Sequence, residues 1–359
     1  MKTVTVNVVS GSYDIIIGPG LLTQTGDRLK AFGFSDKVVI ITDTTVRKLY
    51  GSTLEQILIA SGFEVATLSG ADSEEEKSLE TAGRLYLELT GFHAERGTPV
   101  LALGGGVTGD LAGFVAATYQ RGVPLIQIPT TLLAQADSSL GGKTAVNHGQ
   151  LKNRIGAFYQ PSLTISDIDT LKSLSQRQLA DGLAEIIKHG AIQDADFFEY
   201  LENNIDRIMA LDDDALETTV ARSAEIKAAV VEQDELDLGL RNILNYGHTI
   251  GHAVETVSDF QIDHGRAVAF GMLVAARISN RMGLLDRSDV TRLKKLLTKV
   301  GLLAEVPKLE TDKLIEAMHH DKKIVEGRIK FVLLESIGEV IFTDDVDLEL
   351  VKKVLPEKL

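Results

Sequence analysis

The chain has 359 residues, of which 44% are hydrophobic, so it can bury a large core and has a length typical of about two domains. Its formal net charge of −14 disfavours nucleic acid and anionic membranes as partners, and no apolar run reaches the roughly 20 residues of a membrane span, so we expect a soluble, cytoplasmic protein. Because the sequence contains no cysteine, disulfides and thiolate metal sites are excluded, and any metal must be bound by His, Asp or Glu.

The first half of the sequence alternates between short apolar runs and helical stretches. After an alternating segment at the N-terminus, apolar runs rich in β-branched residues occupy residues 38–42, 64–68, 99–103 and 124–128. Each run is bounded by Gly, Pro or Asp, which is typical of parallel strands in a sheet that is covered on both faces. We therefore predict an α/β domain over residues 1–174.

Helical spacing dominates the second half. From about Ser175 to Leu303, apolar residues recur at positions i, i+3, i+4 and i+7 in several long segments, and a short pair of strands follows. No internal repeat or low-complexity tract interrupts either half. This pattern predicts a mainly α-helical domain over residues 175–359.

A glycine-rich turn follows the predicted strand at 99–103 and leads into a predicted helix. Gly104, Gly106 and Gly109 have the G-x-G-x-x-G spacing that lets a backbone approach a pyrophosphate at a helix N-terminus. The spacing alone fits a tightly packed structural turn equally well, and the strand–turn–helix context favours dinucleotide binding. No acidic residue is well placed about 20 residues further on to bind the ribose, so Asp43, at the end of an earlier strand, is the better candidate.

Two further segments carry charged residues suited to phosphate or nucleotide binding. Glu74 and Lys77 belong to a charged run that is either a nucleotide contact or a solvated surface, and the spacing alone favours the surface. The GGKT segment at 141–144 is similar to the end of a P-loop, but Asp137 stands where that motif needs a glycine. Lys143 can still bind a phosphate as a point charge.

Histidine residues cluster in the second half. His248 and His252 are four residues apart, on one face of a predicted helix, and His264 follows at the start of another helix. The H-x-x-x-H spacing suits two zinc ligands, but no glutamate follows the first histidine, as a metalloprotease would need. On a separate predicted helix, Glu185 and Lys188 share a face.

A single histidine is more often packed or solvated than a metal ligand, but three of the eight histidines lie within residues 248–264. Gly247, Gly251 and Gly265 accompany them, and each would cost about 1 kcal/mol of helix stability relative to alanine in a helix interior. That cost predicts a close approach of another group to the backbone. Together these residues favour a metal site, with the choice of ligands still open among the histidines and Glu185.

Seven segments stand out in chain order: GGGVTGDLAGFVAATYQRG, IPTTLLAQADSSLGGKTAVN, KNRIGAFYQP, GLAEIIKHG, RNILNYGHTIGHAVE, HGRAVAFGM and DKKIVEGRIKFVLL. In sequence and in order, these segments resemble the 3-dehydroquinate synthase family of sugar phosphate cyclases. The resemblance runs nearly from end to end. It implies a Rossmann-like, NAD-binding domain with a parallel sheet, followed by a helical domain that binds metal and substrate.

The resemblance also implies roles for individual residues. Glu185, His248 and His264 match the zinc ligands, with Co²⁺ as a possible substitute, and His252 matches a non-ligand histidine that transfers protons beside the substrate. The positions that match NAD contacts are Asp43, Glu74, Lys77, Gly105, Gly106, Asp110, Thr130, Thr131, Lys143 and Lys152. The positions that match substrate contacts are Asp137, Lys143, Asn153, Lys188, Lys227, Arg241, Asn245 and Lys323 or its neighbour Lys322. Arg121 matches an arginine that reaches the neighbouring subunit's site in a homodimer.

The activity that the resemblance implies is the conversion of 3-deoxy-D-arabino-heptulosonate 7-phosphate to 3-dehydroquinate and phosphate, a shikimate-pathway step toward aromatic amino acids. In that reaction NAD oxidises an alcohol transiently, phosphate is eliminated, the ketone is reduced again, and ring opening and an intramolecular aldol step close the carbocycle. The expected partner is therefore a small phosphorylated sugar acid. Two alternatives are another sugar phosphate cyclase and a metal-dependent polyol dehydrogenase of related fold, and the dehydrogenase would release NADH.

Overall fold

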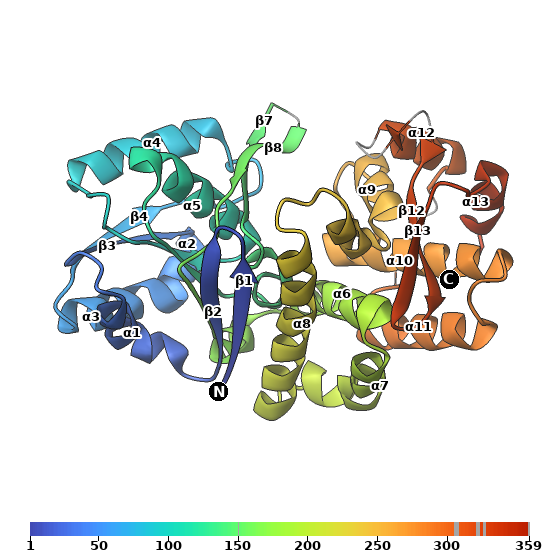
Figure 1. The fold of residues 1–359 in the computed structure, drawn as a ribbon, viewed down its shortest axis with the longest axis horizontal. Helices are drawn as coiled ribbons and strands as arrows, with labels where there is room; N and C mark the ends of the chain where they lie inside the picture. Colours follow the sequence, from blue (N-terminus) through green and yellow to red (C-terminus); the bar gives the residue numbers. More distant parts are fainter. Residues whose placement is uncertain (150, 305–308, 321–323, 326–327, 358–359) are drawn as a thin grey trace. The chain divides into compact units, whose positions relative to one another are not determined.

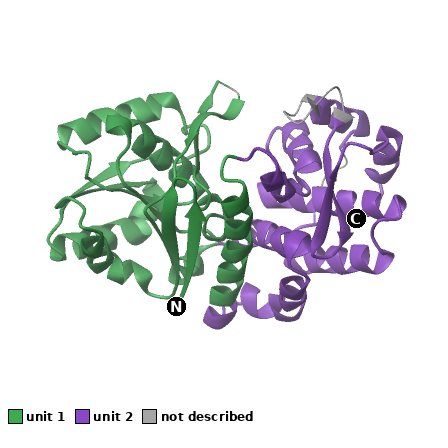
Figure 2. Ribbon diagram, viewed as in Figure 1, with its two compact units in different colours: residues 1–174, 216–236 green, residues 175–215, 237–359 purple. Residues whose placement is uncertain are grey.

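The protein folds into two compact units, which we describe separately (Figure 2). The computed structural model describes the chain except for residues 150, 305–308, 321–323, 326–327 and 358–359. Unit 1 comprises residues 1–174 and 216–236, and unit 2 comprises residues 175–215 and 237–359. The division into a cofactor domain, 1–174, and a metal domain, 175–359, stays a prediction, because compactness alone does not say what a unit binds.

A seven-stranded sheet forms the centre of unit 1 (Figure 1). Its strands are β1 Lys2–Val8, β2 Gly11–Gly18, β3 Lys37–Thr42, β4 Glu64–Ser69, β5 Val100–Gly104, β6 Leu125–Pro129 and β9 Leu163–Asp167. The order across the sheet is β1-β2-β9-β6-β5-β3-β4. β1 and β2 form an antiparallel hairpin, whereas the other neighbours are parallel. The four strands that the apolar runs predict are thus confirmed as β3, β4, β5 and β6.

Each face of this sheet has its own hydrophobic core. The helices of the first part of unit 1 are α1 Thr25–Phe32, α2 Thr44–Val46, α3 Ser52–Ala60, α4 Leu79–Gly91 and α5 Gly106–Thr118. On β3, Val38 and Ile40 pack in one core with residues of α1 and α3, whereas Val39 and Ile41 pack in the other core with residues of α4 and α5. Alternate residues of a strand point to opposite faces, so a strand that is covered on both sides is apolar throughout.

A second hairpin and a helix from later in the chain complete unit 1. The hairpin consists of β7 (Lys143–His148) and β8 (Leu151–Phe158). Helix α8 (Asp213–Gln233) belongs to unit 1 from residue 216 onward, and the Met1 amino group forms an ion pair with Glu217 at 2.9 Å. Short turns of 3-10 or π-helix span Leu21–Gln24, Arg47–Gly51, Tyr119–Arg121, Ala134–Ser138 and Ile168–Ser173.

Unit 2 is mainly helical. Its helices are α6 Gln176–Gln193, α7 Ala195–Met209, α9 His248–Val257, α10 His264–Arg281, α11 Arg287–Val300, α12 Thr311–His320 and α13 Leu348–Val354, and a 3-10 turn spans Leu240–Asn245. The predicted strand pair is confirmed as β12 (Phe331–Ser336) and β13 (Glu339–Thr343), and a shorter pair is β10 (Ile324–Val325) with β11 (Arg328–Ile329). Among the described residues, no helix combines the length and the apolar character that crossing a membrane would require.

The glycines around the histidine cluster allow the helices of unit 2 to pack closely. A Cβ atom on Gly247 would lie 2.8 Å from the Val268 carbonyl oxygen, and one on Gly271 would lie 2.0 Å from the Gly247 carbonyl oxygen. Similarly, a Cβ atom on Gly265 would lie 2.5 Å from the Asp181 carbonyl oxygen. The close approach that Gly247 and Gly265 predict is therefore made by neighbouring helices.

Candidate functional site

The glycine-rich turn lies at the carboxyl end of β5, where α5 begins. Gly105 is the N-cap of α5, and Gly106 is its first residue. A Cβ atom on Gly105 would lie 3.2 Å from the Thr131 side chain, and one on Gly106 would lie 3.1 Å from the Ser138 hydroxyl. The turn therefore lies against the segment that follows β6, and its backbone N–H groups stand at the N-terminus of a 13-residue helix, where an anion is favoured.

Other predicted cofactor residues lie at the same edge of the sheet. The Thr130 N–H donates to the Gly104 carbonyl oxygen at 2.9 Å. Asp43 follows β3 and caps α2, and its carboxylate accepts the N–H groups of Thr45 at 2.9 Å and Val46 at 2.8 Å. The strand order reverses between β3 and β5, and open α/β sheets bind ligands outside the carboxyl ends of their strands at such a point.

Lys77 joins two predicted cofactor residues. Its Nζ lies 3.0 Å from Glu74 Oε1 and 3.0 Å from Asp110 Oδ2, and only 2% of Lys77 is exposed. The side chain of Asn147 donates to the Glu74 carbonyl oxygen at 2.7 Å and accepts the Asn153 N–H at 2.8 Å. The interpretation of this charged run as a solvated surface is therefore wrong for Lys77.

The charges of Lys77 and Asp110 influence each other's pKa. Burial opposes the charged form of Lys77, but Asp110 and Glu74 outweigh it and raise the pKa of the lysine. Burial also raises the pKa of Asp110, against the opposing effect of Lys77. The raised lysine pKa and the 3.0 Å contacts indicate that a charged Lys77 holds the side chains of Glu74 and Asp110 in place.

Two predicted substrate contacts from distant parts of the chain meet in unit 1. Lys227 Nζ, on α8, lies 2.8 Å from Asp137 Oδ1 and donates to the carbonyl oxygen of the same residue at 2.6 Å. Lys227 is buried. In contrast, Lys143, Lys152 and Asn153 lie on the β7–β8 hairpin and are exposed, and Asn153 has φ +53°.

In unit 2, the three predicted metal ligands come together from three helices. Glu185, on α6, is buried, and its Oε1 lies 3.4 Å from His248 Nε2 and 3.3 Å from His264 Nε2. His248 is the first residue of α9, and His264 is the first residue of α10. One ligand atom from each of the three residues lies within 4.8 Å of the other two. A carboxylate and two imidazoles form a donor set that Zn²⁺ accepts in proteins, so these residues fit the predicted metal.

The surroundings of the two histidines differ. Burial lowers the pKa of His248 well below its usual value, which keeps the ring neutral and able to bind a metal. Burial also opposes a charge on His264, but hydrogen bonds with Glu185 and Glu255 outweigh it and raise the pKa to about 10. A metal ion would displace that proton, because imidazole binds metals through a deprotonated nitrogen. Lys188 is buried, and its Nζ donates a hydrogen bond to Glu185.

Three of the remaining predicted residues of unit 2, His252, Arg241 and Asn245, lie near this group in the sequence. The His252 ring meets the His248 ring edge-on, with 5.3 Å between centroids. Arg241, with 2% of its surface exposed, and Asn245 lie in the 3-10 turn that precedes α9. Lys322 and Lys323, one of which is a predicted substrate contact, lie outside the described residues.

The sequence motifs did not predict two acidic residues that lie beside the predicted metal ligands. Glu255 Oε1 lies 3.3 Å from His264 Nδ1, and Asp181 accepts the first backbone N–H after His264. Helical periodicity offers a signal for both, because residues separated by one or two turns share a face. Glu255 is seven residues after His248, and Asp181 is four residues before Glu185.

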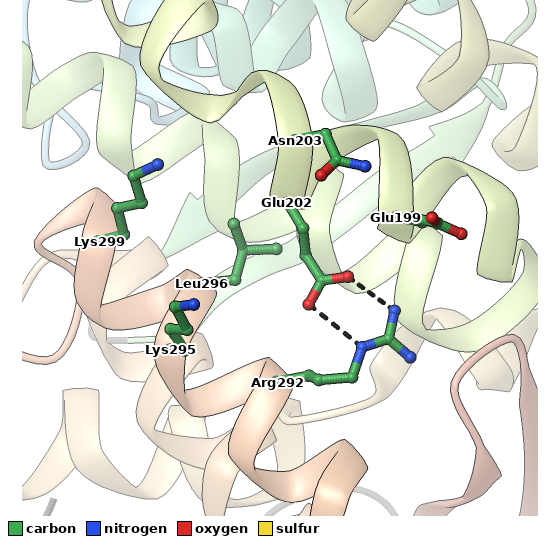
Figure 3. A pocket seen from close by; sticks show the side chains of 7 residues that line it. All are labelled: Glu199, Glu202, Asn203, Arg292, Lys295, Leu296 and Lys299. Atoms are coloured by element: carbon green, nitrogen blue, oxygen red, sulfur yellow. Dashed lines mark hydrogen bonds and ion pairs between the residues drawn. The ribbon is translucent and has the colours of Figure 1, made fainter.

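A separate surface pocket of unit 2 lies between α7 and α11 (Figure 3). It has a volume of about 550 Å³ and is lined by Glu199, Glu202, Asn203, Arg292, Lys295, Leu296 and Lys299. Arg292 and Glu202 form an ion pair at 2.6 Å. Within the part of the chain that the structure describes, none of the predicted cofactor, metal or substrate residues lines this pocket.

Two family models match consecutive parts of the chain. The model described as "3-dehydroquinate synthase N-terminal" matches residues 67–181, and the model described as "3-dehydroquinate synthase C-terminal" matches residues 182–324. Over 346 residues, the chain is 48% identical to a 3-dehydroquinate synthase of Dehalococcoides mccartyi, with 96% of each chain covered. The chain belongs to the 3-dehydroquinate synthase family. It is therefore an enzyme of that type, as the resemblance implied.

Solved structures of sugar phosphate cyclases share the fold of this family member. A 2-deoxy-scyllo-inosose synthase, solved with carbaglucose-6-phosphate, NAD+ and Co²⁺, has a TM-score of 0.92 at 31% identity, with 100% of both chains covered. The 2-epi-5-epi-valiolone synthase from Streptomyces hygroscopicus subsp. jinggangensis, solved with NAD+ and Zn²⁺, has a TM-score of 0.87 at 30% identity, with 96% of this chain and 95% of that chain covered. The predicted fold class, a parallel α/β part followed by a helical part, is confirmed.

Proposed function

We propose that this member of the 3-dehydroquinate synthase family converts 3-deoxy-D-arabino-heptulosonate 7-phosphate into 3-dehydroquinate and phosphate. The carrying observation is that the chain is 48% identical to a 3-dehydroquinate synthase over nearly its full length. Its identity to the two solved cyclases that form other products is lower, 31% and 30%. Neither another cyclase activity nor a polyol dehydrogenase activity is favoured by this comparison.

We propose NAD and Zn²⁺, with Co²⁺ as a substitute, as the cofactors. When bound, NAD takes up and returns a hydride, and the metal polarises an alcohol oxygen as a Lewis acid. The support in unit 1 is the glycine-rich turn beside the point where the strand order reverses. The support in unit 2 is the group of Glu185, His248 and His264. Both cofactor types are present in the solved cyclases named above.

The chain's own residues would bind and orient the cofactors and the substrate. In unit 1, the N–H groups at the start of α5 would bind the pyrophosphate, and Lys77 would hold Glu74 and Asp110 in place beside it. Proposed cofactor contacts also include Asp43, Thr130, Thr131, Lys143 and Lys152. Proposed phosphate contacts are Lys143, Asn153, Asn245 and Lys323. Arg241 would bind the substrate carboxylate. Further substrate oxygens would be bound by Asp137, Lys188 and Lys227, and His252 would transfer protons.

A phosphate-release assay tests the proposed reaction. With the heptulosonate phosphate as substrate and NAD in catalytic amount, we expect many equivalents of phosphate per enzyme and a carbocyclic product, without accumulation of NADH. The reason is that the hydride returns to the substrate within each turnover. Stoichiometric formation of NADH would instead indicate a dehydrogenase, and release of phosphate with a different carbocycle would indicate another cyclase.

Replacing Gly106 with valine should weaken NAD binding by about tenfold or more, because the added side chain would stand where the backbone must approach the pyrophosphate. Even a Cβ atom there would lie 3.1 Å from the Ser138 hydroxyl, so the thermal stability of the free protein is measured in parallel. Titration calorimetry with NAD gives the affinity. Gly83→Val on α4 is the matched control, since a Cβ atom on Gly83 meets nothing within 4 Å. Unchanged affinity in a folded Gly106→Val protein would make the turn purely structural.

We further propose a cytoplasmic location and a homodimer in which Arg121 reaches the neighbouring subunit's site. Arg121 ends the turn after α5, its side chain is exposed, and its backbone has φ +66°. Gel filtration with light scattering measures the oligomeric state.

A further inference from the structure

The two metal-ligand histidines present the same nitrogen to Glu185 and use the other nitrogen differently. In both rings Nε2 faces Glu185 Oε1, at 3.4 Å from His248 and 3.3 Å from His264. The outer nitrogen of His248, Nδ1, lies 3.3 Å from the Tyr246 carbonyl oxygen. The outer nitrogen of His264 lies 3.3 Å from Glu255 Oε1. Each ring therefore has an acceptor behind it, and only His264 has a carboxylate there.

An acceptor behind a ligand histidine controls how the ring binds a metal. A neutral imidazole carries one N–H, so an acceptor at Nδ1 keeps the proton on that nitrogen and leaves the lone pair of Nε2 for the metal. It also fixes the ring orientation, and a carboxylate acceptor forms a stronger hydrogen bond than a neutral carbonyl group. Losing such a partner typically weakens metal binding about 10–100-fold.

The position of Glu255 is set by helix packing rather than by the motif. Glu255 lies on α9, and its side chain is 14% exposed. His264 starts α10, which packs tightly on α9 because Gly247 and Gly271 leave no room for side chains between the two helices. Because α9 carries both His248 and Glu255 on one face, the same packing places a ligand on one side and an acceptor on the other side of His264.

We propose that Glu255 is a positioning residue for the metal site: it accepts the Nδ1–H of His264 and directs Nε2 of that ring toward the metal. The inference rests on the proposed function only insofar as His264 is a metal ligand. In this role Glu255 acts through His264 rather than by binding the metal itself. Its contribution should therefore appear in the affinity and the ligand field of the metal, before any turnover takes place.

Zinc affinity of the metal-free protein is the decisive measurement. The full-length protein is stripped with a chelator and titrated with Zn²⁺ against a chromophoric competitor. Glu255→Ala should weaken Zn²⁺ binding about 10–100-fold, and Glu255→Gln, which keeps an acceptor oxygen but loses the charge, should weaken it less. Wild-type affinity in Glu255→Ala would overturn the proposal. If Glu255→Ala fails to fold, Glu255→Gln decides by the same criterion.

Two further variants separate this inference from its alternatives. Glu202→Ala removes a carboxylate that pairs with Arg292 in the separate surface pocket of the same unit (Figure 3), and it should leave Zn²⁺ affinity unchanged. His264→Ala tests the metal site itself: wild-type affinity in that variant would reject the proposed ligands. Loss of affinity in His264→Ala but not in Glu255→Ala would reject only the role of Glu255.

A spectroscopic measurement adds a readout that a merely structural role would not change. Co²⁺ takes similar ligands and has visible absorption bands that depend on ligand geometry and basicity. In the Co²⁺-loaded protein, Glu255→Gln should shift these bands at saturating metal, while Glu202→Ala should not. An unchanged spectrum together with unchanged affinity would show that Glu255 does not act on the metal.

Discussion

Replacing His264 with alanine should remove most of the bound Zn²⁺ and lower kcat/KM at least about a thousandfold, since the Lewis-acid contribution of a metal amounts to several kcal/mol and each 1.4 kcal/mol is tenfold in rate. The structural basis is the approach of His264 Nε2 to Glu185 Oε1 at 3.3 Å, within the group formed with His248. Removing one of three protein ligands leaves too few to hold the ion.

Metal content by elemental analysis and turnover by phosphate release measure the two parts of this prediction. His93→Ala is the control, because His93 is exposed and lies in unit 1. We expect that variant to keep its metal and its activity. A His264→Ala protein with full metal content would contradict the ligand assignment.

Arg241 and Lys143 should bind opposite ends of the same substrate. A chain with a net charge of −14 must create a local positive field to bind a substrate that carries both a carboxylate and a phosphate. Arg241 is buried, and its guanidinium group matches a carboxylate through two parallel hydrogen bonds. Lys143 begins β7 directly after Gly141 and Gly142, where a flexible exposed ammonium group suits a phosphate.

We expect Arg241→Ala to weaken binding of the natural substrate about 30-fold or more, because truncating one member of a buried charge pair costs about 2–5 kcal/mol. The same variant should weaken binding of an analogue without the carboxylate much less. Lys143→Ala should weaken binding of both compounds, since both keep the phosphate. Inhibition and saturation kinetics with the two compounds give the four affinities. Equal losses for both compounds in Arg241→Ala would reject the carboxylate role.

Local sequence patterns predicted the strands of unit 1 well, best where both faces of the sheet are covered. The apolar runs at 38–42, 64–68, 99–103 and 124–128 became four parallel strands. β3, β5 and β6 are buried almost throughout, which leaves a nearly continuous apolar run in the sequence. β4 lies at the edge of the sheet and is mostly half-buried or exposed, so its run is less apolar. The glycine-rich turn was equally predictable. Its strand–turn–helix context depends only on neighbouring residues.

Contacts between distant segments were not predictable from spacing. Lys77 lies in a run of acidic residues that looks solvated, but its side chain donates to Asp110, 33 residues later, and its carbonyl oxygen accepts the Asn147 N–H. Asp137 and Lys227 are separated by 90 residues and meet only in the folded unit. For the same reason, helical spacing did not decide which of the histidines and Glu185 are metal ligands. Glu185 joins the histidines only through the packing of α6, α9 and α10.

The discontinuous course of unit 1 has a consequence for biosynthesis. Because this unit consists of residues 1–174 together with 216–236, a nascent chain of 174 residues lacks the helix that supplies Lys227 to Asp137 and Glu217 to the N-terminal amino group. On the ribosome, the first unit therefore remains incomplete until residue 236 has left the exit tunnel, by which time α6 and α7 of the second unit have already emerged. The two units are thus interleaved along the chain, and we expect a chain truncated at residue 174 to lack the contacts that α8 makes with the rest of unit 1.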